Sequence, residues 1–130
     1  MTLSAEESIN VLGEPLEACS MEPLTGFFRD GHCNTCSADQ GSHTVCAVMN
    51  EEFLAYSAYV GNDLSTPAPQ YAFPGLKPGD HWCVCARRFL QAHDEGCAPY
   101  VNLRATHRRA LDVIPLEVLQ RYDTGRVRPR

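Results

Sequence analysis

The stretch Thr44–Val60, TVCAVMNEEFLAYSAYV, predicts a strand followed directly by a helix, and the rest of the fold follows outward from it. Its first six residues are apolar and partly β-branched, which favours a buried strand over a helix too short to nucleate. Asn50 is then a typical N-cap residue, and Gly61 marks the end of the helix. Phe53 and Tyr56 recur at a spacing that places both on one helical face.

Further short elements are predicted on both sides of this stretch. We expect strands at 82–86 and 100–103, helices at 87–95, 106–111 and 116–122, and a hairpin at 25–34. The hairpin would turn at Asp30-Gly31, with Arg29 as part of the turn, and Pro115 would be the first residue of the last helix. These elements predict an α+β fold, with a small, largely antiparallel sheet and three or four short helices.

The region between residues 61 and 80, GNDLSTPAPQYAFPGLKPGD, contains four prolines and three glycines and predicts a long Pro/Gly-rich loop. Its polar side chains and the aromatic residues near them are of the kinds that line small-molecule sites. The ligand-binding candidates are Asn62, Asp63, Thr66, Asp80 and Trp82. The alternative is that polar side chains in such a loop only stabilise its turns, through hydrogen bonds to the backbone.

Length and composition favour one domain of intracellular type. The 130 residues fit a single domain, residues 1–130, whose ends at 1–8 and 124–130 are expected to be frayed. The first residues lack the features of a secretory signal, which predicts a cytoplasmic protein. Apolar stretches fall far short of the roughly 20 residues that cross a bilayer, so no membrane partner is expected. The arginines near the C-terminal end are too sparse to predict nucleic-acid binding.

Seven cysteines are many for a chain of this length. Because their number is odd and no secretory signal is recognised, we expect reduced thiols and not a secreted disulfide framework. Burial as small hydrophobic side chains is the leading interpretation, and metal ligation and thiol chemistry are the alternatives.

A metal site would combine cysteines and a histidine from separate segments. Cys33-x-x-Cys36 has the spacing of half a zinc site, and a second pair could come from the segments around residues 43–46 or 81–85. Zinc or iron would be the cofactor. The candidate ligands are Cys33, His43, Cys46, Cys83 and Cys85.

A reactive thiol is the other enzymatic hypothesis. Cys83 is the candidate nucleophile, because His81, two residues earlier in a strand, would share its face and could take its proton. His107, from a later segment, is the second candidate for that role. The sequence contains no P-loop, His-Glu-x-x-His, Gly-x-Ser-x-Gly or EF-hand pattern, which removes the commonest motif-based nucleotide, protease, hydrolase and calcium interpretations.

The order of segments resembles a known family. The segments are NVLGEPLEACS (10–20), TGFFRDGHC (25–33), HTVCAVM (43–49), GNDLSTPAP (61–69), FPGLKPGDHWCVCA (73–86) and ATHRRAL (105–111). They resemble the small bacterial proteins catalogued as domain of unknown function 2237, over nearly the whole chain. The resemblance implies no activity, but it marks Asn62, Asp63, Asp80, Trp82, Cys83 and Cys85 as positions of interest.

The family resemblance also bears on the metal hypothesis. Cys36 and Cys97 stand where other residue types are expected in that family, which argues against a metal site that depends on Cys36. The resemblance therefore favours a ligand set of Cys33, His43, Cys46 and Cys83.

The sequence leaves the function open between hypotheses of different classes. The leading one is a binding or interaction module whose 61–83 loop recognises a small molecule or a protein partner. The alternative is a thiol- or metal-dependent enzyme that uses Cys83 with His81, or the cluster of Cys33, His43, Cys46 and Cys83. In a third, purely structural interpretation, the cysteines are core residues and the loop only packs.

Overall fold

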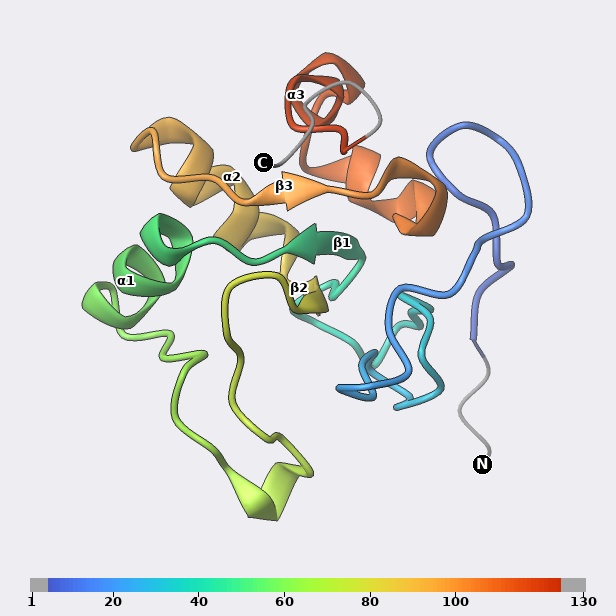
Figure 1. Ribbon diagram of the computed structural model, residues 1–130. Coiled ribbons are helices and arrows are strands. Elements are labelled where there is room, and N and C mark those ends of the chain that lie inside the picture. The colour runs from blue at the N-terminus through green and yellow to red at the C-terminus, as the bar shows by residue number, and fades with distance from the viewer. Residues whose placement is uncertain (1–4, 125–130) are drawn as a thin grey trace.

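A three-stranded antiparallel sheet lies at the centre of the computed structural model, which describes residues 5–124 (Figure 1). The strands are β1 (Val45–Val48), β2 (His81–Val84) and β3 (Tyr100–Val101), in the order β2-β1-β3. The α-helices are α1 (Glu51–Tyr59), α2 (Ala86–Asp94) and α3 (Leu116–Arg121). Three 3-10 helices complete the set: η1 (Pro69–Tyr71), η2 (Leu103–Ala105) and η3 (Arg108–Asp112). The fold is therefore α+β, as the sequence predicts.

The 44–60 stretch forms the strand and helix that its residue pattern predicts. All four residues of β1 are buried, as expected for the central strand of the sheet. The Asn50 side chain caps α1 by accepting a hydrogen bond from the Phe53 backbone N–H at 2.7 Å. Phe53 and Leu54 are buried by α1 against the core, so this end of the sheet is covered by a helix.

Alternation along β1 and β2 gives the sheet an apolar face and a cysteine face. On the apolar face, Val45, Ala47, Trp82 and Val84 belong to the main core, together with residues of α1, α2 and α3. On the other face, Cys46 and Cys83 stand opposite each other in the β1–β2 register and belong to a second buried cluster. That cluster consists of Cys19, Cys33, Cys46, Cys83 and Ala105.

Two threonine hydroxyls attach other parts of the chain to the cysteine face. The Thr25 hydroxyl accepts a hydrogen bond from the Cys83 backbone N–H at 2.9 Å, and the Thr106 hydroxyl accepts one from the Cys46 backbone N–H at 3.1 Å. Both threonines are fully buried. The N-terminal third of the chain is therefore held against β2, close to Cys83.

The predicted hairpin at 25–34 is wrong, because the structure places no strand in that segment. The segment folds back on the preceding chain instead: the Gly31 carbonyl accepts a hydrogen bond from the Cys19 backbone N–H at 2.7 Å. Gly26, Arg29 and Gly31 have positive φ angles of 103°, 52° and 85°. These conformations close tight turns through which an extended strand does not continue.

The C-terminal elements differ from the prediction in detail. The expected helix at 106–111 is the 3-10 helix η3, and the expected strand at 100–103 is reduced to the two residues of β3. Pro115 is the N-cap of α3 and not its first helical residue. The remaining helices begin and end within one or two residues of the predicted bounds.

Both described ends of the chain are bonded to the fold. The Glu6 backbone N–H donates to the Thr35 carbonyl at 2.7 Å, and the Thr124 N–H donates to the Val101 carbonyl at 2.9 Å. The rest of the ends that the sequence predicts to be frayed, residues 1–4 and 125–130, lies outside the described residues. Among the described helices, none is long and apolar enough to cross a membrane.

Candidate functional site

A cavity of about 640 Å³, called the loop cavity below, lies between the 61–73 segment, β2 and the turn at 26–29. In Figure 1 the chain from α1 to β2 makes a long excursion away from the sheet, with η1 at its far end. The aromatic lining residues are Phe27, Tyr71, Phe73 and Trp82. The lining also includes charged residues, polar residues and one cysteine: Arg29, His43, Asn62, Asp63 and Cys83. The cavity is therefore mainly aromatic, with charged and polar groups on part of its wall.

The excursion is fixed by contacts between its two legs. The Leu76 backbone N–H donates to the Leu64 carbonyl at 2.8 Å. Gly75 allows this close approach, because a Cβ atom at that position would lie 2.6 Å from the Ser65 carbonyl oxygen. The Phe73 and Trp82 rings pack edge to face, with their centroids 5.1 Å apart. This contact attaches the excursion to β2. The aromatic wall is thus fixed by contacts within the chain itself.

Arg29 is held over the aromatic wall by its own turn. Its Nη1 donates to the Gly26 carbonyl at 2.6 Å, and its Nη2 donates to the Tyr71 carbonyl at 3.0 Å. The guanidinium carbon lies 5.0 Å from the centre of the Trp82 ring, a cation–π distance. Gly26 is required here, since a Cβ atom on it would collide with the His32 carbonyl oxygen. The turn therefore fixes the position of a cation at the cavity.

Within residues 5–124, no carboxylate forms an ion pair with Arg29. Its Nε is buried and has no hydrogen-bond partner in that part of the chain. The Arg29 backbone has the left-handed φ of 52°, which costs a non-glycine residue free energy and is often found at functional sites. An anion in the cavity would provide the counter-charge for the Arg29 guanidinium.

His43 also lines the cavity, and Asp39 fixes its ring. The His43 Nδ1 lies 2.6 Å from Oδ1 of Asp39, and the His43 backbone N–H donates to Oδ2 at 2.9 Å. The Thr35 hydroxyl donates to the same Oδ2 at 3.0 Å. The Asp39 side chain is 1% exposed and the His43 side chain 43% exposed. The second ring nitrogen of His43, Nε2, therefore remains for proton transfer.

The charge of Asp39 is maintained by these hydrogen bonds. Burial alone would raise the pKa of Asp39, but the hydrogen bonds from the His43 ring and backbone and from Thr35 hold that pKa below its ordinary value. Asp39 is thus ionised at neutral pH and orients the His43 ring. The same arrangement orients a general base in many enzymes.

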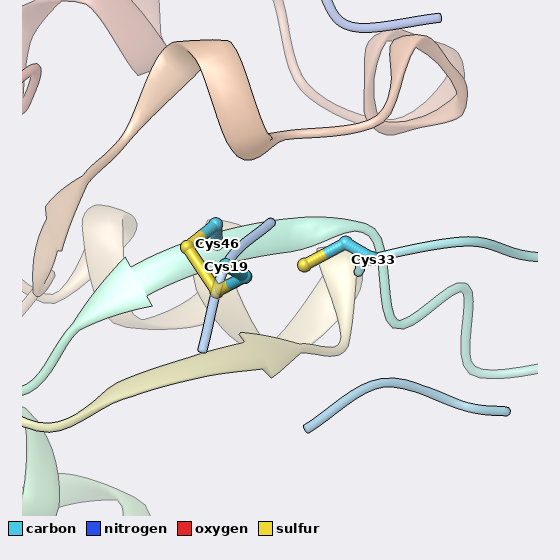
Figure 2. A group of neighbouring side chains, drawn as sticks. All are labelled: Cys19, Cys33 and Cys46. Atoms are coloured by element: carbon cyan, nitrogen blue, oxygen red, sulfur yellow. A yellow bond between two sulfur atoms is a disulfide. The ribbon is translucent and has the colours of Figure 1, made fainter. Parts of the chain in front are cut away.

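Four cysteines form two disulfides in the cysteine cluster. Cys19 is bonded to Cys46, and Cys33 is bonded to Cys83. The Sγ atoms of Cys19, Cys33 and Cys46 all lie within 4.8 Å of one another. Figure 2 shows the Cys19–Cys46 bond with the Cys33 sulfur directed toward it. The two disulfides are therefore neighbours, and Cys83 is part of the wall of the loop cavity.

The expectation that all seven cysteines are reduced thiols is wrong for these four. The odd number of cysteines is not informative here, because three others, Cys36, Cys85 and Cys97, are free. The β1–β2 register, which aligns Cys46 with Cys83 on one face, is what gathers the cluster, and this register cannot be obtained from residue spacing.

The metal-site candidates are brought together only in part. Cys33, Cys46 and Cys83 share the cluster, joined by Cys19, which the sequence analysis did not include. In the disulfide form their sulfurs are not thiolate ligands; a metal would need the reduced form. The His43 ring is bonded to Asp39, and Cys85 lies at the N-cap of α2. A zinc or iron site that uses Cys33, Cys46 and Cys83 as ligands therefore remains a proposal for the reduced protein.

The predicted ligand-binding residues divide into two groups. Asn62, Asp63 and Trp82 line the loop cavity, whereas Thr66 and Asp80 are absent from its lining as described. The Thr66 hydroxyl donates to Asp63 Oδ2 at 2.6 Å, and this hydrogen bond, with those from two backbone N–H groups, lowers the pKa of Asp63. Asp80 accepts a hydrogen bond from the Lys77 backbone N–H at 2.9 Å. Asp63, Thr66 and Asp80 thus form the turn contacts considered as the alternative.

The two histidines predicted to assist Cys83 do not line the loop cavity as described, although His81, two residues before Cys83 in β2, shares its face of the strand as predicted. His81 begins β2, and neither it nor His107 is among the described lining residues of the loop cavity. His107 is fully buried: its Nε2 lies 2.9 Å from the Glu7 carbonyl oxygen, and its Nδ1 accepts from the Arg109 backbone N–H. Burial lowers the pKa of His107, so the ring is neutral and attaches the N-terminal segment to η3. His43 is the histidine that shares the cavity with Cys83.

Arg29, Asp39 and Cys19 are site residues that the sequence analysis missed. Arg29 was interpreted as part of a simple turn, and its pairing with Trp82 spans 53 positions of the chain (82 − 29) with no local pattern. Asp39, four residues before His43, is the only one of the three with a sequence signal, an acidic group close to a candidate histidine. Cys19 gave no signal beyond its residue type.

One comparison with known proteins identifies a family. The model of the family described as an uncharacterised protein conserved in bacteria (DUF2237) matches residues 9–123, nearly the whole chain. No curated protein matches. The matched residues include the loop cavity, both disulfides and the Asp39–His43 pair.

Proposed function

Since the chain belongs to the DUF2237 family of proteins conserved in bacteria, we propose its function from the geometry of the site: it binds a small organic anion in the loop cavity. The observation that carries this proposal is the Arg29 guanidinium. It is fixed over Trp82, forms no ion pair within residues 5–124, and has a buried Nε without a hydrogen-bond partner there. An arginine in a partly desolvated site favours a carboxylate or another planar oxyanion.

The rest of the lining supports an anion with an apolar body. Phe27, Tyr71 and Phe73 line the same cavity as Arg29 and add aromatic surface, which suits the hydrocarbon or ring portion of an organic acid. Asp63 is the acidic group of the lining, and its carboxylate oxygens are occupied by the Ser65–Thr66 turn. Asn62 also lines the cavity, and its amide is the kind of group that provides a polar contact for a ligand.

The proposal predicts that Arg29→Gln weakens binding of an aromatic carboxylate by about tenfold or more, the cost of losing one charge-assisted contact of roughly 1.5–3 kcal/mol. Trp82 is the sole tryptophan, so its fluorescence reports on the cavity during titration with phenylacetate. Arg29→Lys, which keeps the charge, should retain part of the affinity. Arg87→Gln, an exposed arginine of α2, is the control and should bind as the wild type does.

The neutral analogue 2-phenylethanol separates charge recognition from simple hydrophobic binding. It should bind the wild type and Arg29→Gln equally weakly. Equal affinity of the wild type for phenylacetate and 2-phenylethanol would contradict the proposal, because the guanidinium would then contribute nothing to recognition.

The second candidate function is thiol–disulfide exchange at Cys33–Cys83. The observation that favours it is that Cys83 lines the same cavity as the Asp39-oriented His43. A thiol in the cavity would lose its proton to His43 Nε2, and its sulfur would attack Cys83 Sγ. The Cys33–Cys83 bond breaks, a mixed disulfide forms at Cys83, and Cys33 leaves as a thiolate that takes up a proton. A small thiol that also carries a carboxylate would use both proposed properties of the site, which are anion binding and disulfide exchange.

The compartment bears on this candidate. We propose that the protein is cytoplasmic, and disulfides in that compartment are usually transient and reactive. A disulfide at a cavity wall would then be an intermediate of a reaction and not a permanent crosslink. The direct test is the rate at which thiols of different charge reduce Cys33–Cys83.

A further inference from the structure

We propose that Cys33 passes disulfide exchange inward, from Cys83 at the loop cavity to the buried Cys19–Cys46 disulfide. This inference rests on the proposed exchange at Cys33–Cys83 and adds a second redox pair to it. The reductant is a small-molecule thiol that enters the loop cavity, and the electrons are stored in Cys19 and Cys46.

The Cys33 sulfur lies between Cys83 and the Cys19–Cys46 disulfide. It is bonded to the Cys83 sulfur and lies within 4.8 Å of the sulfurs of both Cys19 and Cys46. Figure 2 shows the Cys33 sulfur directed toward the Cys19–Cys46 bond. A thiolate released at Cys33 would therefore face a disulfide across a distance that a side-chain rotation can close.

The four bonded cysteines differ in whether they line the loop cavity. All four cysteines are buried: Cys33 and Cys46 are 0% exposed, Cys83 is 1% exposed and Cys19 is 7% exposed. Within residues 5–124, Cys83 alone of the four lines the loop cavity. A thiol bound in the loop cavity thus meets Cys33–Cys83 first, and Cys33 is placed to carry the exchange on to Cys19–Cys46.

The steps balance in atoms and electrons. An external thiol attacks Cys83 and forms a mixed disulfide, and Cys33 leaves as a thiolate. That thiolate attacks the Cys19–Cys46 bond, forms a disulfide with one of these two cysteines, and releases the other as a thiolate, which is protonated.

Two further exchanges complete the transfer. A second external thiol attacks the mixed disulfide and releases Cys83 and an external disulfide. The Cys83 thiolate then attacks Cys33, which restores Cys33–Cys83 and frees the second buried thiol. Overall, two external thiols become one disulfide, and Cys19–Cys46 becomes two thiols.

The variant Cys83→Ser tests the inner step without any external reagent. It leaves an unpaired Cys33 beside the Cys19–Cys46 bond, and we expect a substantial fraction of the folded protein to carry Cys33 joined to Cys19 or to Cys46. The Cys36→Ser background removes the nearby free thiol from the Cys33 fragment. Cys85→Ser in that background is the matched control and should keep both native disulfides.

Mass spectrometry of acid-quenched, alkylated protein reads out the pairings. Cleavage at acidic residues separates the cysteines, because Glu22 lies between Cys19 and Cys33, Asp39 between Cys33 and Cys46, and Asp80 before Cys83. A folded Cys83→Ser variant that carries only Cys19–Cys46 and a free Cys33 thiol would overturn the relay.

The second measurement uses wild-type protein, so it does not depend on whether a variant folds. Folded protein is treated with 2-mercaptoethanol for increasing times and mapped in the same way. The expected result is a transient mixed disulfide at Cys83 and disulfides between Cys33 and the inner pair, followed by free thiols at Cys19 and Cys46 with Cys33–Cys83 restored. Reduction that stops at Cys33–Cys83 overturns the relay and leaves exchange at the cavity intact. If neither disulfide is reduced while the protein remains folded, the proposed exchange fails, and the relay fails with it.

Discussion

Replacing Cys33 and Cys83 together by alanine is expected to lower the free energy of unfolding by about 4 kcal/mol, because their crosslink closes a segment of 50 residues in the unfolded chain. Cys19 and Cys46 are separated by 27 residues, so their joint replacement should cost slightly less, about 3.5 kcal/mol. Urea unfolding at neutral pH measures both values. Cys97→Ala, at a partly exposed free cysteine, is the control and should change the free energy by less than about 0.5 kcal/mol.

The same experiment distinguishes the stability contributed by a crosslink from the stability contributed by side-chain packing. Fully reduced wild-type protein should lose more stability than either double variant, since it loses both crosslinks. If either double variant is as stable as the wild type, its cysteine pair is not bonded in solution. That result would remove the basis of the exchange proposal for that pair.

The second large effect is expected at Asp39. Asp39→Ala should lower the free energy of unfolding by about 3 kcal/mol, because it leaves the Thr35 hydroxyl and the His43 backbone N–H without their buried acceptor. The His43 ring would also lose the partner that orients it. Urea unfolding gives the loss of stability, and the rate of Cys33–Cys83 reduction gives the effect on His43.

The pH dependence of the Asp39 contribution has a defined sign. The pKa of Asp39 in the folded protein lies below its ordinary value of 3.8, so the native state favours the ionised form. Its contribution to stability is therefore present above about pH 4 and is lost as the pH falls through the lower pKa of the folded state. Asp39→Asn cannot ionise and should show a smaller loss of stability between pH 5 and pH 3. An identical acid profile for Asp39→Asn and the wild type would contradict this assignment.

Local patterns were sufficient to predict the elements around the central strand. The apolar β-branched run at 44–49 and the Asn50 cap predicted β1 and α1, because both signals depend on neighbouring residues only. The strand and helix on either side of Cys85 were predicted on the same grounds. The failure at 25–34 has the same origin: Asp30-Gly31 is a good local hairpin signal, but contacts with Cys19 and Cys83 determine how this segment folds.

The site itself could be predicted only in part. Residue type marked Cys83, Asn62, Asp63 and Trp82, and these do line the loop cavity. The disulfide partners and the position of Arg29 over Trp82 depend on strand register and on turns with positive φ, which join residues distant in sequence. No periodicity or spacing in one sequence contains that information.

The central claim, that Arg29 selects an anion beside a reactive disulfide, is tested most directly by comparing two thiols. Cys33–Cys83 is reduced with mercaptoacetate, which is anionic, and with neutral 2-mercaptoethanol. Disulfide mapping follows the reaction, and each rate is corrected for the thiolate fraction of the reagent. The wild type should react at least about tenfold faster with mercaptoacetate, and Arg29→Gln should lose this preference while its rate with 2-mercaptoethanol stays within about twofold. Equal rates with both thiols in the wild type, or a preference that persists in Arg29→Gln, would contradict the account.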